Sequence, residues 1–249
     1  MTKRLTAKLF FTLLLLSSAP FVLAQNDGHR FEVSGLYTHA RMTYASTTFT
    51  FNDGSRTVTV NACQQPNQYV APNASKALCD RRGFNGFDVS AVGNITRYWG
   101  IKGNFSGYFK KDRFTDTLTN PTETFTSDYR ERYYQFLGGV QLKDNATEAR
   151  VKPYAHALFG GARYRSTLVM VSTNPVNSDN QVTEMTAPAL KLGGGLDVRL
   201  NARMDLRVFE INYNPVFGRD HTTTSLITPF SNQGVTKHNI SFGIGLVIH

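Results

Sequence analysis

The sequence predicts an all-β fold: an eight-stranded antiparallel up-and-down transmembrane β-barrel with four long extracellular loops and three short periplasmic turns. The first observation is the last stretch, 239–249, in which every even residue from Ile240 to Ile248 is apolar. Such alternation over about 9–11 residues is typical of a strand that crosses a membrane. The second is a set of eight alternating stretches whose connections run long, short, long, short, long, short, long. The third is that no apolar run after residue 24 is long enough for a membrane helix.

The strands are expected to be short, aromatic-rich and separated by polar segments that contain Gly, Pro, Asn and Asp. A soluble barrel with its apolar faces inside is the alternative, but it needs a charged exterior that the final strand does not supply. The predicted strands are 30–42, 85–96, 101–111, 129–142, 151–165, 187–200, 203–214 and 239–249. The predicted long loops are 43–84, 112–128, 166–186 and 215–234.

The N-terminus has the features of an export signal. Lys3 and Arg4 precede an apolar run, and Val22 and Ala24 occupy the −3 and −1 positions of a cleavage site. This order predicts a secretory signal peptide over residues 1–24 and an outer-membrane β-barrel domain over residues 25–249. A membrane-anchor helix is the alternative, but the apolar run is short and interrupted by polar residues and a proline.

Composition argues against several function classes. The formal net charge is +9 at pH 7, but Lys and Arg are scattered with no run longer than a pair, so no nucleic-acid partner is expected. We find no Walker-type loop, no dinucleotide-binding GxGxxG after a strand and no HExxH, so no cofactor or metal is predicted. The glycine triplet Gly193–Gly195 lies in an alternating stretch, which indicates close packing in a strand.

The first strand is followed by the longest loop, which contains both cysteines of the chain, Cys63 and Cys79. In an exported protein these are predicted to form a disulfide. Free thiols are the alternative. A metal site is not expected, because two cysteines with no nearby histidine supply too few ligands. A small hairpin is predicted near residues 56–60 of the same loop.

The second and third strands have so short a connection that they are predicted to form a hairpin. Its tip carries Tyr98 and the only tryptophan, Trp99. A membrane barrel places such side chains at the membrane–water interface, so both are predicted interfacial aromatics. An aromatic turn that caps a soluble core is the alternative.

The fifth strand is the least regular of the eight. Its two arginines, Arg163 and Arg165, are predicted to face the barrel interior. The opposite face, turned toward the lipid, then holds Tyr154, His156, Leu158, Ala162 and Tyr164.

The seventh strand changes its apolar phase in the middle. Met204, Leu206 and Val208 alternate in one phase, whereas the apolar residues from Phe209 onward follow the other. A β-bulge near Val208–Phe209 is therefore predicted, which turns Glu210 inward. The eighth strand is expected to pair with the seventh and, to close the barrel, with the first.

The inward faces of these strands carry charges of both signs. An eight-stranded barrel has an interior only wide enough for its own side chains or one small ligand. Ion pairs are therefore expected to plug the lumen, and a gated ion path is the alternative. The predicted lumen charge network is Glu32, Asp88, Lys102, Glu131, Lys191, Asp197, Arg199, Arg207 and Glu210.

The chain resembles the OmpA-type outer-membrane β-barrel family, in particular its single-domain members, some of which are described as porin-family proteins. The resemblance covers the mature region and rests on GFDVSAVGNITRYWGIKGNFSGYF at 86–109, RVFEINY at 207–213 and the final strand. It implies a location in the cell outer membrane, contact with outer-membrane lipid and lipopolysaccharide, and insertion by the barrel-assembly machinery. Members commonly end on an aromatic residue, whereas this sequence ends on His249.

These observations favour a structural or surface-interaction role. A small-solute or ion pore is the first alternative, and a lipid-modifying enzyme is the second. The nucleophile–base candidates are His221 with Ser225 and His238 with Ser241, but neither pair has an evident carboxylate to orient the histidine, so no enzyme is predicted. The first loop is far longer than a connection requires, which indicates binding of an extracellular ligand through the loops.

Overall fold

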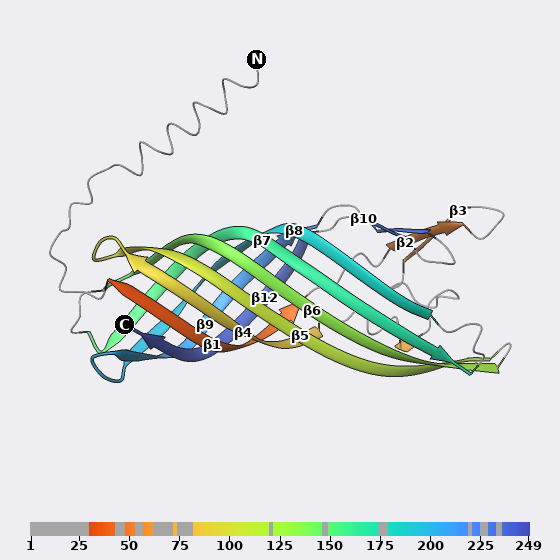
Figure 1. The fold of residues 1–249 in the computed structure, drawn as a ribbon, viewed down its shortest axis with the longest axis horizontal. Coiled ribbons are helices and arrows are strands. Elements are labelled where there is room, and N and C mark those ends of the chain that lie inside the picture. The colour runs from red at the N-terminus through yellow and green to blue at the C-terminus, as the bar shows by residue number, and fades with distance from the viewer. Residues whose placement is uncertain are drawn as a thin grey trace, which may run out of the picture.

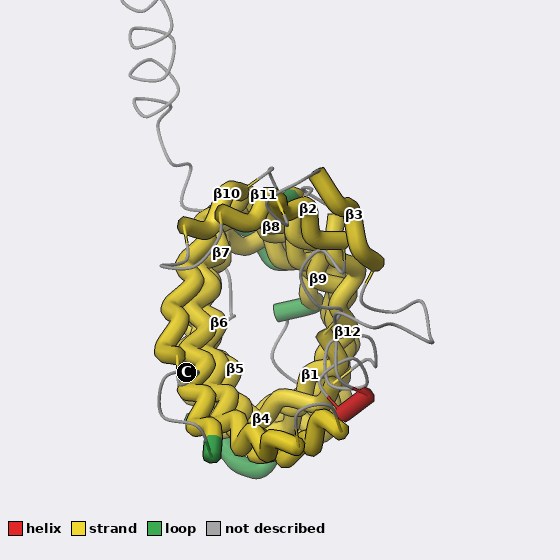
Figure 2. Tube along the Cα trace, turned by 90° about the vertical axis from the view of Figure 1, so that its right-hand side faces the viewer, coloured by secondary structure: helices red, strands yellow, loops and turns green. Residues whose placement is uncertain are grey.

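The computed structural model describes residues 30–42, 48–52, 57–61, 72–73, 82–119, 122–145, 149–173, 179–218, 221–224, 229–232 and 236–249. Eight of its strands close into an antiparallel barrel in the order β1-β12-β9-β8-β7-β6-β5-β4, as predicted (Figures 1 and 2). Their bounds are β1 Phe31–Met42, β4 Arg82–Asn94, β5 Trp99–Thr119, β6 Thr122–Lys143, β7 Val151–Ser172, β8 Asp179–Arg199, β9 Met204–Phe217 and β12 Thr236–Ile248. No helix in the described part of the chain is long and apolar enough to span a membrane.

The barrel is apolar outside and polar inside. Strand β1 alternates strictly between exposed and buried residues along its 12 positions. Phe31 and Phe136 point outward with 73% and 65% of their surface exposed, whereas Glu32 and Lys102 point inward and are 3% and 1% exposed. A protein that folds in water has the opposite arrangement, so this exterior is suited to hydrocarbon.

The strands differ in length by almost a factor of two. Strands β5 to β8 have 21 or 22 residues, whereas β1, β4, β9 and β12 have 12 to 14. A membrane-spanning strand needs only ~9–11 residues. The four long strands therefore continue as a sheet beyond the end of the barrel opposite the C-terminus, toward the right in Figure 1.

This projecting sheet corrects two predicted loops. Residues 112–119 and 122–128 belong to β5 and β6, and most of 166–186 belongs to β7 and β8. The apolar alternation stops there because this part of the sheet lies beyond the hydrocarbon. Threonine pairs across the strands contribute instead: Thr115 and Thr117 lie within hydrogen-bonding distance of Thr126 and Thr124, at 3.4 and 3.2 Å between hydroxyl oxygens.

Closure of the barrel and the bulge in β9 agree with the sequence. Strand β12 pairs antiparallel with both β9 and β1. Arg207 and Glu210 are three residues apart in β9, but the residues opposite them are only two apart in each neighbouring strand. These are Gly245 and Gly243 in β12, and Asp197 and Gly195 in β8. Val208 and Phe209 are both exposed, while Arg207 and Glu210 are both buried. The predicted bulge is confirmed.

The prediction for the fifth strand was wrong. In β7 the exposed and buried faces are reversed, with Arg163 and Arg165 exposed and His156 5% exposed inside the barrel. The arginines lie on the extracellular part of the strand, beyond the apolar lipid-facing rows, so they need no place in the lumen. The residues that the structure turns inward are Tyr154, His156, Leu158, Ala162 and Tyr164.

Two of the long loops contribute to a separate four-stranded sheet in the order β10-β11-β2-β3. The first loop supplies β2 (Thr48–Asn52) and β3 (Thr57–Asn61), and the last supplies β10 (His221–Thr224) and β11 (Pro229–Asn232). A hairpin of β2 and β3 thus occupies the region where a smaller one was predicted. Figure 1 draws this sheet at the end of the barrel where β5 to β8 project. The predicted signal peptide and both cysteines lie outside the described residues.

Candidate functional site in the barrel interior

Two ion pairs join opposite walls of the barrel. Nζ of Lys191 on β8 lies 2.7 Å from the carboxylate of Asp88 on β4. Nζ of Lys102 on β5 lies 3.8 Å from the carboxylate of Glu210 on β9. In the closed order of strands, β8 lies opposite β4 and β5 lies opposite β9. The ring of backbone in Figure 2 is therefore not an open channel, because side chains bridge it from wall to wall.

The ammonium group of Lys191 has an acceptor for each of its protons. It donates to Asp88, to Oδ1 of Asn104 at 2.7 Å and to Oγ of Ser106 at 2.8 Å. Asn104 in turn donates to Asp88 at 2.6 Å. These four side chains are buried. A fully satisfied cluster of this kind leaves no polar atom that requires water.

Arg207 is the centre of a second cluster. Its guanidinium donates to both carboxylate oxygens of Asp197, at 2.8 and 3.0 Å, and to Glu210 at 2.9 Å. It also lies 4.1 Å from the ring centroid of Tyr154, whose hydroxyl donates to Glu210 at 2.5 Å. The bidentate contact and the ring hold the guanidinium in one orientation.

His156 lies beside the Arg207 cluster, between Lys102 and Asn212, both of which contact Glu210. Its Nδ1 lies 3.2 Å from Nζ of Lys102, and its Nε2 lies 2.9 Å from Oδ1 of Asn212. Because Nδ of Asn212 donates to Glu210 at 2.8 Å, Oδ1 of Asn212 is the acceptor that faces the ring. Nε2 of His156 therefore donates and Nδ1 accepts from Lys102, which defines the tautomer.

The periplasmic end of the lumen is also occupied by ion pairs. Nζ of Lys143 lies 2.9 Å from both Glu32 and Asp197, so it connects β1 with β8. Asp205 lies 3.1 Å from Lys152 and 2.9 Å from Nε2 of His249. The last residue of the sequence thus faces inward, next to a carboxylate.

The structure places the sequence-predicted charges on inward rows. Arg199 is half-buried on the same row as Asp197. Glu131 lies farther toward the extracellular end, where it accepts a hydrogen bond of 2.5 Å from Tyr164. Of the nine charged residues predicted to line the lumen, those no more than 3% exposed are Glu32, Asp88, Lys102, Glu131, Lys191, Asp197, Arg207 and Glu210.

Besides Tyr164, which donates to Glu131, sequence reasoning missed six titratable participants in these contacts. Asp205 lies two positions before Arg207 on the same face, so the alternation of β9 already contained the signal for it. Lys143 lies one residue beyond the predicted end of its strand. Tyr154 and His156 were assigned to the wrong face, and Lys152 shares that face. The six are Lys143, Lys152, Tyr154, His156, Asp205 and His249.

An apolar cluster fills the lumen on the extracellular side of Lys191. Toward the extracellular end, the next inward residues on β8 beyond Lys191 are Ala189 and Ala187. On β5 the next inward residue beyond Ser106 is Tyr108. We call this set the apolar plug. Its members are Ala40, Met42, Phe84, Tyr108, Tyr133, Leu137, Leu158, Ala162, Ala187, Ala189 and Val216.

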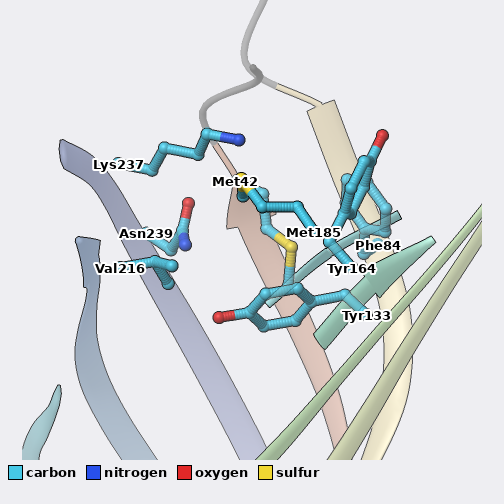
Figure 3. A pocket seen from close by; sticks show the side chains of 8 residues that line it. All are labelled: Met42, Phe84, Tyr133, Tyr164, Met185, Val216, Lys237 and Asn239. Atoms are coloured by element: carbon cyan, nitrogen blue, oxygen red, sulfur yellow. The ribbon is translucent and has the colours of Figure 1, made fainter. Parts of the chain in front are cut away.

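A recess of about 340 Å³, which includes space open to solvent, lies at the extracellular mouth above the apolar plug. Figure 3 shows Lys237 and Asn239 on one side of it, and Tyr133 with the two methionines Met42 and Met185 across from them. Nζ of Lys237 lies 5.5 Å from the ring centroid of Tyr164. Met42, Phe84, Tyr133 and Val216 belong to the apolar plug, so the recess ends there rather than continuing into the lumen.

The other sequence candidates lie apart from this interior. His238 is exposed and stacks on Tyr213 with ring centroids 5.8 Å apart, whereas Ser241 is buried in the lumen, so the two residues form no catalytic pair. The side chain of His221, and Ser225, are outside what the structure describes. Within the described residues no group of three or more His, Cys, Asp or Glu side chains is arranged to hold a metal ion.

Tyr98 and Trp99 lie at the periplasmic end, in and next to the turn between β4 and β5, with 46% and 51% of their surface exposed. The guanidinium of Arg97 lies 5.0 Å from the ring centroid of Tyr98 and donates to Asp144 at 2.9 Å. The hydrogen bond with Asp144 raises the pKa of Arg97 above its usual value.

Comparison with known proteins finds a matching family model and solved structures of similar fold. Residues 9–247 match the family model for the outer membrane protein beta-barrel domain. No curated protein sequence matches the chain significantly.

Solved structures of similar fold include Ail, the attachment invasion locus protein of Yersinia pestis, at 13% identity over 88% of this chain and 100% of that chain, with a TM-score of 0.40. OprG from Pseudomonas aeruginosa is 12% identical over 90% of this chain and 98% of its own, with a TM-score of 0.44. The outer membrane protease OmpT from Escherichia coli is 10% identical over 92% and 99%, with a TM-score of 0.49. At these identities the similarity concerns the fold and assigns no activity.

Proposed function

Since the chain belongs to the outer membrane protein β-barrel domain family, and is thus an outer-membrane barrel, we propose that it is a closed barrel that anchors an extracellular interaction surface. In this proposal the lumen carries no solute. Its role is to hold the projecting strands and the loop sheet at the cell surface.

The observation that carries the proposal is the pair of wall-to-wall contacts, Lys191 with Asp88 and Lys102 with Glu210. All four side chains are no more than 1% exposed. A conducting path along the lumen would have to break these contacts. Each charge that stays buried after it has lost its partner costs several kcal/mol. A solute would then also have to displace the apolar plug.

The surface role is supported by the extracellular part of the molecule. Strands β5 to β8 are about twice as long as a membrane crossing requires, and two loops donate strands to an additional sheet. Asn73 of the first loop donates from its side chain to the backbone oxygen of Thr115 at 2.9 Å and from its backbone to Asp116 at 3.2 Å. Asn73 is thus held against the projecting part of β5. Ordered structure of this extent outside the membrane is consistent with a binding surface.

The test is conductance of the purified protein in a planar lipid bilayer. The native protein is expected to show no steady openings. Lys102→Ala and Lys191→Ala combined with Tyr108→Ala and Leu158→Ala are expected to produce them, because both wall-to-wall contacts and two large side chains of the apolar plug are then removed. Arg97→Ala combined with Arg113→Ala removes two charges at exposed sites and serves as the matched control, which should stay silent. Steady ion-sized openings of the native protein would establish the pore alternative instead.

A further inference from the structure

Five basic residues gather on the outward face of three adjacent strands, on the extracellular side of the barrel. They are Lys111 on β5, Arg130 and Arg132 on β6, and Arg163 and Arg165 on β7. All five are exposed, and the side chains of Arg163 and Arg165 are 62% and 52% exposed. We call this set the basic belt.

The basic belt begins where the aromatic part of the lipid-facing surface ends. Phe105 stacks on Phe136 with ring centroids 4.5 Å apart, and Phe109 packs edge-on against Tyr134 at 5.8 Å. In the strand register Phe109 lies opposite Arg132. Aromatic side chains mark the interface of a membrane barrel with water. The basic belt therefore lies at the level of the lipid headgroups of the outer leaflet.

The charges of the basic belt oppose one another within the sheet. Lys111 lies directly opposite Arg130, and Arg132 lies directly opposite Arg165. Like charges in directly opposed positions destabilise a sheet, because the side chains are only ~5 Å apart at their Cβ atoms. Two such pairs side by side are unfavourable unless an anion lies between them.

Few carboxylates compensate this charge. Glu184 contacts Arg163 at 2.9 Å and Arg165 at 3.4 Å, and it is the acidic residue paired with the basic belt in the described part of the chain. Asp128 also faces Arg130, but both of its oxygens accept hydrogen bonds from Arg113, at 2.5 and 2.8 Å. Among the described residues, Lys111, Arg130 and Arg132 therefore form no ion pair, and Arg163 and Arg165 share one carboxylate.

We propose that the basic belt binds the phosphate groups of outer-leaflet lipids, with lipid A of lipopolysaccharide as the lipid that presents them. Guanidinium groups bind phosphate oxygens in pairs, and an anion between opposed arginines relieves their repulsion. A lipid source is favoured over a soluble polyanion because the apolar surface directly below is exposed: Phe136 and Phe159 have 65% and 61% of their surface accessible to acyl chains. One ligand can thus contact both surfaces at once.

The experiment measures binding of defined lipids to the full-length folded protein by native mass spectrometry. The probes are bisphosphorylated lipid A, dephosphorylated lipid A and inositol hexakisphosphate, which has phosphates but no acyl chains. The test variant is Arg132→Gln with Arg165→Gln. The control is Arg150→Gln with Arg203→Gln, which removes the same charge from exposed positions at the periplasmic end.

We expect the native protein and the control to retain bisphosphorylated lipid A, and the test variant to bind it at least about tenfold more weakly, since two charge-assisted contacts are lost. Heat-dependent gel mobility shows whether each variant is folded. If the test variant does not fold, Lys111→Gln with Arg130→Gln replaces it.

Two results would overturn the proposal. One is equal binding of bisphosphorylated and dephosphorylated lipid A, or equal binding by the native protein and the belt variants. The other is binding of inositol hexakisphosphate as tight as that of lipid A, which would assign the site to a soluble polyanion.

Discussion

Replacing Lys191 tests whether the lumen contacts hold the barrel together. Methionine is similar in length and keeps the space filled, but it removes the cation from Asp88, which is 1% exposed, and the donor to Asn104 and Ser106. Breaking a buried ion pair by removing one partner costs about 3–5 kcal/mol, because the remaining charge is left without compensation. We expect Lys191→Met to lower the free energy of unfolding by that amount.

A second substitution separates this effect from loss of packing. Lys191→Met with Asp88→Asn removes both charges and leaves an amide that can still bond to Asn104. We expect the double variant to recover more than half of the loss, because no buried charge remains unpaired. Arg113→Gln breaks an exposed ion pair and is the control, expected to change the stability little.

The assay is equilibrium unfolding from lipid vesicles in urea, followed by the fluorescence of Trp99, the only tryptophan of the chain. A loss below ~1 kcal/mol for Lys191→Met would contradict the reasoning, since it would mean that water or another group compensates Asp88. Equal destabilisation of the single and double variants would also contradict it, because packing rather than charge would then be responsible.

Three further predictions concern separate parts of the chain. Deleting Val208 removes the extra residue of the bulge and leaves Arg207, Phe209 and Glu210 in regular alternation, so the heat-dependent gel mobility of the folded barrel should be kept, whereas deleting Ile211, where the register is regular, reverses the faces of one part of β9 and should abolish it. Hydrogen bonds from Arg113 hold the pKa of Asp128 below its usual value, so the stabilisation from this pair is present above the unfolded pKa and is lost as the pH falls through the folded one. Carboxyl NMR should show the pKa of Asp128 rising in Arg113→Gln, and an unchanged value would contradict the pairing. For the disulfide, alkylation without reductant followed by mass spectrometry should leave Cys63 and Cys79 unlabelled, and two labels would show free thiols.

The two errors in predicting the strands have the same physical origin. An apolar alternation reports only where a strand meets hydrocarbon. The outer parts of β5 to β8 lie beyond the hydrocarbon, so their sequence resembles a loop even though threonine pairs such as Thr115 and Thr126 lie across the sheet. In β7 the inward face contains tyrosine, leucine and histidine, a composition that resembles a lipid-facing row. The sequence does not show that Tyr154 and His156 have polar partners on other strands.

The number and order of the barrel strands, the bulge at Val208 and the inward position of most lumen charges were determined by the sequence alone. They follow from a two-residue period and from the hydrocarbon that surrounds the strands. Only the tertiary structure decided which charges pair, because Lys191 and Asp88 are 103 positions apart and meet across the closed barrel. The structure also shows that the apolar plug and the wall-to-wall contacts lie at different levels of the same lumen. Alternation alone assigns a residue to the inward or the outward face but does not identify its partner.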